Sequence, residues 1–266
     1  MRLWTPYEEA AQQNKLWTPK LIRSSLAYWI DPARLDASYS GTSITSIPDV
    51  SGNGQALSNL GGTRVFSRMG LRGRPAFDFQ LGQAYGASSV ACGSAGSFIA
   101  AAVFTLRSTA ANQFRILSCG NADDWNSNTY AALMCRESPY GLRINSTWSA
   151  ASQLVTTSGI AYDTPMIFVV YRDGTNAYHR LNGVTTAGPS SSALSLGTVT
   201  FRIGTYLLST TDTTSRMDGL IAEQMVALSY SLPLLQKIEG HLSHKHGVPL
   251  RGDHPHLYAP PLLHGG

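Results

Sequence analysis

The sequence has few charged residues, and they do not cluster. Asp, Glu, Lys and Arg make up 14% of the 266 residues, against about 25% in an average soluble domain. The formal net charge is +4, but there is no Lys/Arg run and no basic helix. Nucleic acid therefore has little support as a partner, because its phosphates attract clustered basic side chains.

Long apolar runs and cysteines are also scarce. No window approaches the roughly 18 continuous apolar residues of a transmembrane helix, and residues 1–15 have no apolar core of the signal-peptide type. Cys92, Cys119 and Cys135 are odd in number and lack C-x-x-C spacing. Such cysteines are typical of small buried thiols in a protein that folds in a reducing compartment. We expect a soluble protein with no membrane contact and no cleaved signal.

Catalytic motifs are a third absence. No G-x-S-x-G or P-loop pattern occurs in the chain. Glycosidases need two carboxylates placed across one sugar linkage. No glutamate here has another carboxylate two or four residues away; the five are Glu8, Glu9, Glu137, Glu223 and Glu239. We therefore predict that the chain is not an enzyme.

What the sequence does contain is typical of β structure. Gly, Ser and Thr are abundant, and hydrophobic residues make up 43% of the chain. Short segments rich in β-branched and aromatic residues alternate with turn signals, among them the hairpin dipeptides Asp173-Gly174 and Asn182-Gly183. The nearly all-apolar segment 97–108 is expected at the centre of a sheet. The pattern predicts an all-β fold, an antiparallel two-sheet sandwich or jelly roll.

Helical periodicity is clear only after Ser231. Pro233 suits a first helical turn and Gly247 suits a left-handed cap, and one apolar stripe joins Leu234, Leu235, Ile238 and Leu242. The segment also holds His241, His244 and His246. A zinc site would need three or four converging ligands, but on this helix His246 should point away from the other two. We predict a scaffolding helix at the edge of the sandwich and no metal site.

The chain divides into three parts. The tetrapeptide LWTP occurs at 3–6 and again at 16–19, and a helix start of Thr5, Pro6 and Glu8 follows the first copy. Residues 1–15 are either an N-terminal arm that packs on something outside the domain or a frayed tail. Residues 16–250 show no composition break and are expected to form one domain. Residues 251–266 form a Pro-rich C-terminal tail, either an extended contact or a disordered end.

Motifs at both ends of the domain resemble those of laminin G-like, concanavalin A-like jelly-roll domains. Near the end, GLIAE (219–223), KIEG (237–240) and HKHG (244–247) are similar to the family's closing strand, helix and turn, with His246 in place of the usual Trp. Near the start, LAYWIDP (26–32), Asp49 with SGNG (51–54), and GRPAFDF (73–79) resemble recurrent landmarks. The resemblance spans about 16–255. It implies a jelly roll in which the SGNG loop and the closing helix are architectural.

The resemblance and the absences together favour a virion structural protein, because such jelly rolls are common in phage particles. We expect a capsid decoration, head-fibre or tail-associated protein that forms a homo-oligomer. It would fold in the bacterial host cytoplasm and reside in the virion. Its partners would be other virion proteins, and the arm would anchor it through buried contacts of Leu3, Trp4, Pro6 and Trp17.

The alternative function is a carbohydrate-binding module that attaches to a host surface glycan. Lectin-like sandwiches use aromatic platforms and loop Asn/Asp residues, sometimes with Ca²⁺ held by oxygen ligands. The segment 121–130 has this composition, with candidate residues Asp123, Asp124, Trp125, Asn126 and Asn128. A solvated loop with one Trp folded onto the sheet is the plainer interpretation. Apart from Ca²⁺ in such a loop, no cofactor is expected.

Overall fold

The computed structural model describes most of the predicted domain. The described residues are 17–35, 44, 46–61, 65–79, 84–87, 90–91, 96–107, 113–120, 131–136, 143–149, 152–191, 198–203 and 217–255. The predicted N-terminal arm, 1–15, lies outside these residues, as does most of the predicted tail.

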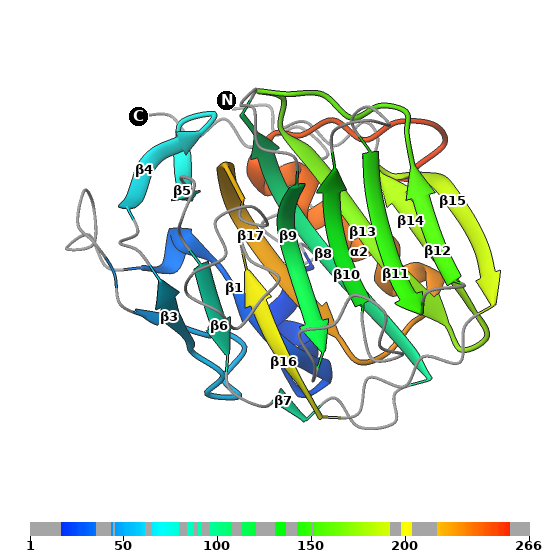
Figure 1. Ribbon diagram of the computed structural model, residues 1–266, viewed down its shortest axis with the longest axis horizontal. Helices are drawn as coiled ribbons and strands as arrows, with labels where there is room; N and C mark the ends of the chain where they lie inside the picture. The colour runs from blue at the N-terminus through cyan, green and yellow to red at the C-terminus, as the bar shows by residue number, and fades with distance from the viewer. Residues whose placement is uncertain are drawn as a thin grey trace, which may run out of the picture.

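Two antiparallel sheets build the molecule (Figure 1). Sheet A has the order β15 (Val184–Ser191), β14 (Asn176–Leu181), β13 (Met166–Asp173), β8 (Ser97–Leu106), β17 (Gly219–Ala227), β5 (Arg74–Phe79) and β4 (Val65–Leu71). β1 (Leu26–Ile30) also pairs with β17. Sheet B has the order β12 (Ser152–Thr156), β11 (Arg143–Ser149), β10 (Ala131–Arg136), β9 (Gln113–Gly120), β16 (Thr198–Ile203), β6 (Ala84–Ala87), β3 (Leu57–Gly61) and β2 (Ser46–Ile47), and β7 (Val90–Ala91) pairs with β16. The predicted all-β, two-sheet sandwich is confirmed.

Strand β8 shows how the centre of sheet A is buried on both faces. It lies between β13 and β17, and every residue from Phe98 to Leu106 is buried. Phe98 and Phe104 point into the core between the sheets, whereas Ile99, Ala101 and Val103 point to the opposite face. Alternation with a period of two therefore serves two apolar layers at once. The central position predicted for this segment is confirmed.

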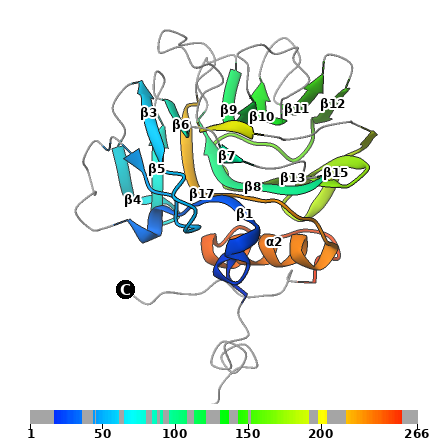
Figure 2. The same ribbon diagram turned by 90° about the horizontal axis from the view of Figure 1, so that it is seen from below.

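The second apolar layer is covered by the C-terminal helix. α2 (Leu232–His246) lies against the outer face of sheet A (Figure 2). Leu235, Ile238 and Leu242 are fully buried there. The Ser231 side chain accepts a hydrogen bond from the Leu234 N–H, and Gly247 ends the helix in the left-handed region at φ 66°. The predicted start, stripe and cap of the helix are confirmed.

The predicted hairpins form at the predicted dipeptides. β13 pairs with β14 across Asp173-Gly174, where the Asp173 carboxylate accepts hydrogen bonds from the N–H groups of Thr175 and Asn176 at 3.0 and 2.8 Å. β14 pairs with β15 across Asn182-Gly183, both with positive φ. Two such residues give a turn whose twist matches that of the flanking strands.

The SGNG loop is held to the first strand of the domain. The Asp49 carboxylate accepts hydrogen bonds from the N–H groups of Trp29, Ser51 and Gln55, and from the Ser51 hydroxyl. Asn53 donates to the Leu26 carbonyl. Two short 3-10 helices, η1 (Pro19–Ser25) and η2 (Pro32–Arg34), lie on either side of β1 in the chain. The loop is therefore part of the frame, as the resemblance implied.

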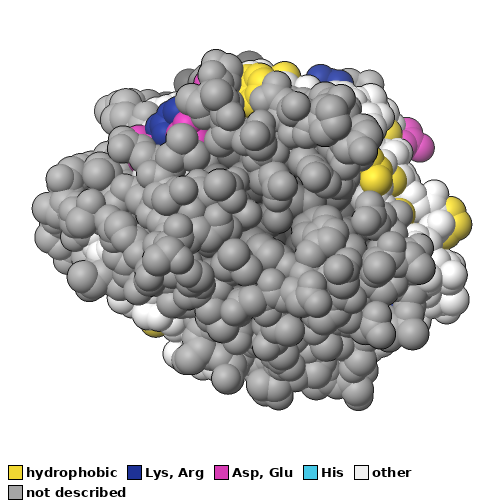
Figure 3. All heavy atoms as spheres, in the orientation of Figure 1, with side chains coloured by type: hydrophobic (Ala, Val, Ile, Leu, Met, Phe, Trp, Pro, Cys, Tyr) yellow, Lys and Arg dark blue, Asp and Glu magenta, His cyan; other side chains and the backbone are white. Residues whose placement is uncertain are grey.

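The described surface has only scattered apolar side chains. Those that are large and exposed are Leu21, Val184 and Leu232. In Figure 3, hydrophobic side chains of the described residues reach the surface in small separate groups. Isolated positions of this kind do not define a docking face. No helix in the described ranges has the length and apolarity needed to cross a membrane.

Candidate binding site

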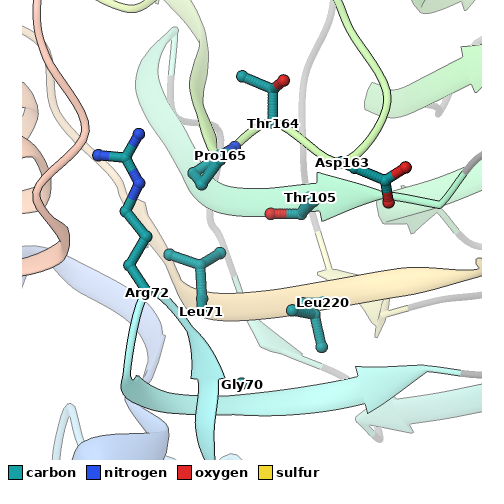
Figure 4. A pocket seen from close by; sticks show the side chains of 8 residues that line it. All are labelled: Gly70, Leu71, Arg72, Thr105, Asp163, Thr164, Pro165 and Leu220. Atoms are coloured by element: carbon teal, nitrogen blue, oxygen red, sulfur yellow. The ribbon is translucent and has the colours of Figure 1, made fainter.

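A pocket opens on the outer face of sheet A (Figure 4). Its cavity volume is about 460 Å³, within the range of about 300–1,000 Å³ usual for small-molecule sites. We call it the outer-face pocket. Its lining residues are Gly70, Leu71, Arg72, Thr105, Asp163, Thr164, Pro165 and Leu220.

The sheet register builds the floor of this pocket. Leu220 of β17 stands opposite Asp78 of β5 on one side and opposite Thr105 of β8 on the other. The three side chains therefore form one row on the outer face of sheet A, the face on which Leu71 and α2 also lie. Next to the row, a Cβ on Gly219 would lie 2.0 Å from the Thr105 carbonyl oxygen. Only glycine allows β17 to approach β8 so closely at this point.

The Thr105 hydroxyl is the unusual feature of the floor. Thr105 is 8% exposed, and within the described ranges its Oγ1 has no hydrogen-bond partner. In Figure 4 this oxygen points toward Leu71 and Pro165, into the pocket. A buried hydroxyl left without a partner costs about 1–3 kcal/mol. Neighbouring atoms cover the surface of this oxygen, so a ligand hydroxyl could bond it and remove that cost only where the lining side chains move aside.

Two residues in left-handed conformations form opposite sides of the pocket (Figure 4). Arg72 (φ 50°) and Gly73 make the two-residue turn between β4 and β5, and Asp163 (φ 52°) lies in the loop before β13. The Asp163 N–H donates to the Leu106 carbonyl at 2.7 Å, which fixes that loop on the end of β8. Left-handed backbone is uncommon for residues other than glycine and is found preferentially at binding and active sites.

An ion cluster borders the pocket at Asp78. Arg107, two residues after Thr105, binds the carboxylates of Asp78 and Asp218, the latter at 3.0 Å, and donates to the Phe79 carbonyl. The Asp218 carboxylate is largely buried. One guanidinium charge is thus shared between two carboxylates, and the contacts fix the strand ends beside the pocket.

These groups define what the pocket can do chemically. Leu71, Pro165 and Leu220 provide apolar contact, while Thr105, Thr164 and Asp163 provide hydroxyl and carboxylate oxygens. An apolar floor with a few placed polar groups suits a small amphipathic ligand that carries several hydroxyls. In the described ranges, no group of three His, Cys, Asp or Glu side chains is placed to hold a metal ion.

The histidines of α2 belong to a second polar region on the same face, which we call the Glu223 cluster. Fully buried Glu223 accepts hydrogen bonds from Trp29 Nε1 (2.7 Å), Lys245 Nζ (2.7 Å), His241 Nε2 (3.0 Å) and His246 Nε2 (2.8 Å). Lys245 also contacts Asp31 at 2.6 Å. Through these hydrogen bonds the Glu223 carboxylate connects its own strand, β17, to β1 and to α2.

The electrostatics of the cluster follow from this pairing. Burial alone would raise the pKa of the Glu223 carboxyl, but the Lys245 ammonium and the imidazoles hold it well below its usual range. Burial lowers the pKa of His246 despite its contact with Glu223. A neutral His246 donates through Nε2 and leaves Nδ1 unprotonated, which agrees with Nδ1 having no partner among the described residues.

One expectation about these histidines was wrong. His246 does not point away from His241, because both side chains reach the same carboxylate. The two residues are about 140° apart around the helix, so they flank its buried face and meet at an acceptor on the sheet beneath. Glu239 forms a separate buried cluster with Arg180 (2.8 Å) and His254 (3.0 Å).

Most of the site residues proposed from the sequence lie outside the described residues. Leu3, Trp4 and Pro6 are outside the described residues, as are the proposed glycan ligands Asp123, Asp124, Trp125, Asn126 and Asn128. Trp17 is described and half-buried, with its ring 6.1 Å from that of His241 in an edge-on contact. Trp17 therefore packs on its own domain. Its predicted role as an anchor stays a prediction.

Sequence reasoning missed the outer-face pocket. Its residues come from four separate segments that only the sheet register and one loop bring together. Two weak signals were present. Thr105 is a polar residue inside the apolar run 97–106, and Asp163 stands in the turn-like Asp-Thr-Pro sequence before the next strand.

Comparisons with known proteins show the fold. No family model and no curated protein sequence matches the chain. Domain 4 of AbnA, a GH43 extracellular arabinanase from Geobacillus stearothermophilus in complex with arabinotriose, superimposes with a TM-score of 0.55 at 14% identity, over 81% of this chain and 98% of that one. Trypanosoma rangeli sialidase in complex with sialic acid gives 0.55 at 10% identity, over 81% and 32%.

A GH54 α-L-arabinofuranosidase soaked with a cyclic sulfate inhibitor gives a TM-score of 0.55 at 13% identity, over 84% of this chain and 64% of that one. The chain spans about a third of the length of the sialidase structures it matches. At these identities the likeness shows the fold alone. It places the chain among β-sandwich, jelly-roll-like domains and agrees with the concanavalin A-like resemblance.

Proposed function

We propose that the protein is a non-catalytic carbohydrate-binding module and that the outer-face pocket is its glycan site. The observation that carries the proposal is the buried Thr105 hydroxyl, which points into the pocket without a partner among the described residues. A sugar hydroxyl can both donate to and accept from it. The arabinanase domain, of which this chain covers 98%, is in complex with arabinotriose in its solved structure and supports the same class of ligand.

Binding without catalysis is the better fit to the carboxylates around the pocket. Asp163 is the only carboxylate among the described lining residues. The neighbouring Asp78 and Asp218 are both engaged by Arg107. Hydrolysis of a glycosidic bond needs one carboxyl group as acid and a second as base or nucleophile. A single available carboxylate suits recognition of hydroxyls.

The proposal is tested by glycan binding of the wild-type protein and of Thr105→Val. An array of neutral and acidic oligosaccharides is screened first, and hits are measured by titration calorimetry. Valine keeps the shape of threonine and replaces its hydroxyl with a methyl group, so the fold should remain while affinity falls about five- to tenfold. That loss corresponds to one hydrogen bond of about 1–1.5 kcal/mol.

Thr156→Val is the matched control. Thr156 is likewise a buried threonine, but its hydroxyl contacts His179 Nδ1 at 3.1 Å and Thr186 Oγ1 at 2.7 Å, and it does not line the pocket. Its variant should bind glycans like the wild type when compared as folded protein. If the protein binds no glycan on the array, or if wild type and Thr105→Val bind equally, this site is ruled out.

The virion role stays a prediction, since none of the described contacts bears on it. Mass spectrometry of purified phage particles would test it through the copy number of the chain per particle. A carbohydrate-binding module can also be carried on a particle, so a positive result there would be compatible with the pocket.

A further inference from the structure

We propose that the outer-face pocket selects neutral, hydroxyl-rich sugars and discriminates against sugars that carry a carboxylate. This inference rests on the proposed glycan-binding function. It adds the chemical class of the ligand, which follows from how the charges around the pocket are placed and paired.

Among the described residues, no cation is bound to the Asp163 carboxylate that lines the pocket. Asp78 and Asp218 stand beside the pocket floor. The described cations nearby are Arg72, Arg107 and Arg74, which lies opposite Leu71 in the sheet and has a partner of its own. Arg107 binds both Asp78 and Asp218, so its charge is already compensated. Within the described residues, a ligand carboxylate would therefore approach Asp163 with no free cation on that side of the pocket to pair with. Like charges at close range are unfavourable.

Arg72 on the opposite side is also engaged. Its Nη1 donates to the carbonyl of Gly247, the residue that ends α2. The last carbonyls of a helix carry partial negative charge, which a guanidinium complements. Part of the attraction that Arg72 offers is thus directed to the end of the helix. To bind a carboxylate with its full charge, Arg72 would have to leave this position.

The hydrogen-bonding groups of the pocket favour donors on the ligand. The Asp163 carboxylate only accepts hydrogen bonds, and the Thr164 hydroxyl already donates to the Tyr162 carbonyl at 3.1 Å, so it is left to accept. Sugar hydroxyls donate as well as accept, whereas an ionised carboxylate donates nothing. The hydroxyl of a neutral sugar can therefore donate to either residue, whereas a carboxylate at the same place cannot.

The test compares oligosaccharides that differ by their carboxylates, with galactotriose and trigalacturonate as the first pair and cellotriose and a glucuronate-containing trisaccharide as the second. Affinities are measured by titration calorimetry or by chemical-shift changes at millimolar sugar and low salt, where charge effects are least screened. We expect the neutral member of each binding pair to bind about tenfold more tightly.

Two variants separate the contributions of the charged residues. Asp163→Asn keeps a residue type that tolerates the left-handed backbone and removes the carboxylate, so the preference for the neutral sugar should fall about fivefold, the size of an exposed charge pair. Arg72→Asn removes the charge on the other side of the pocket. In this variant the preference for the neutral sugar should stay the same or increase.

The outcomes distinguish this inference from the function on which it rests. If no sugar of either kind binds at millimolar concentration, the proposed function is wrong. If acidic members bind as tightly as neutral members, or more tightly, the protein is a glycan binder but the inferred class is wrong. An unchanged preference in Asp163→Asn would likewise overturn the charge argument.

Discussion

Two polar regions share the outer face of sheet A and differ in how their groups are satisfied. In the Glu223 cluster, a fully buried carboxylate accepts hydrogen bonds from four side chains, one on β1 and three on α2. In the outer-face pocket, the buried Thr105 hydroxyl has no partner within the described ranges, and Asp163 and Arg72 stand apart on opposite sides.

The difference separates a structural polar group from a recognition group. A buried charge is tolerated only when it is paired and hydrogen-bonded, and the Glu223 cluster meets that requirement within the fold. The pocket leaves hydrogen-bonding capacity open next to apolar surface. The sequence analysis predicted a scaffolding role for the histidine-rich helix, and the contacts of its groups with Glu223 agree with a structural role.

The largest loss of stability is expected from removing the carboxylate at the centre of the Glu223 cluster. Glu223→Ala would leave Lys245, His241 and the Trp29 N–H without their buried acceptor. Breaking a buried ion pair from one side costs about 3–5 kcal/mol, so urea unfolding should show a loss of free energy of unfolding of that size. The control is Asp253→Ala, an exposed carboxylate, which should change it by less than about 0.5 kcal/mol.

A loss below about 1 kcal/mol in Glu223→Ala would mean that water replaces the carboxylate easily. The cluster would then be less essential to the fold than its contacts indicate. Glycan affinity per folded molecule should not change in this variant, because Glu223 does not line the pocket.

The fold around the Glu223 cluster could be predicted only in part from the sequence. The caps and apolar stripe of α2, the hairpins at Asp173-Gly174 and Asn182-Gly183, and the central strand β8 each follow from a local pattern, and the structure confirms them. The role of Glu223 does not, because its partner Trp29 lies 194 residues away. A lone glutamate within the apolar strand 219–227 was the available signal.

The outer-face pocket could not be predicted from the sequence. Its floor depends on a register that places Leu220 opposite both Asp78 and Thr105, and no periodicity in any one strand specifies that register. Arg72 and Asp163 adopt left-handed backbone only because a tight hairpin and a loop fixed on β8 require it. Composition directed attention to aromatic and Asn/Asp-rich loops, whereas this site uses threonines, one carboxylate and aliphatic side chains.

The free energy of unfolding should fall in acid because of the buried histidines and Glu223. Burial lowers the pKa of His179 to about 3 and also lowers that of His246, while their unfolded values are about 6.5. The unfolded chain therefore binds more protons below pH 6.5, and stability falls as the pH decreases. Each such histidine contributes a slope of up to about 1.4 kcal/mol per pH unit. Glu223 adds to the loss below about pH 4.5, since its folded pKa is depressed.

Urea unfolding between pH 8 and pH 5 measures this slope. In His179→Leu the slope below pH 6.5 should be smaller by the contribution of one proton, whatever the offset in stability at pH 8. A wild-type free energy of unfolding that is flat from pH 8 to 5 would mean that the buried histidines gain protons without loss of structure.

The smallest effect compares two buried threonines and bears most directly on the pocket. Removing a hydroxyl that has partners loses their hydrogen bonds, so Thr156→Val should lower the free energy of unfolding by about 1–2 kcal/mol, because His179 Nδ1 and Thr186 lose a partner. Removing an unpartnered hydroxyl releases a desolvation cost, so Thr105→Val should leave stability unchanged or raise it by up to about 1 kcal/mol. Thermal or urea unfolding of both variants, without added sugar, measures the two changes. A clear destabilisation by Thr105→Val would show that the hydroxyl is satisfied within the folded protein. The contrast between the paired region and the pocket would then disappear, together with the main reason to place a ligand there.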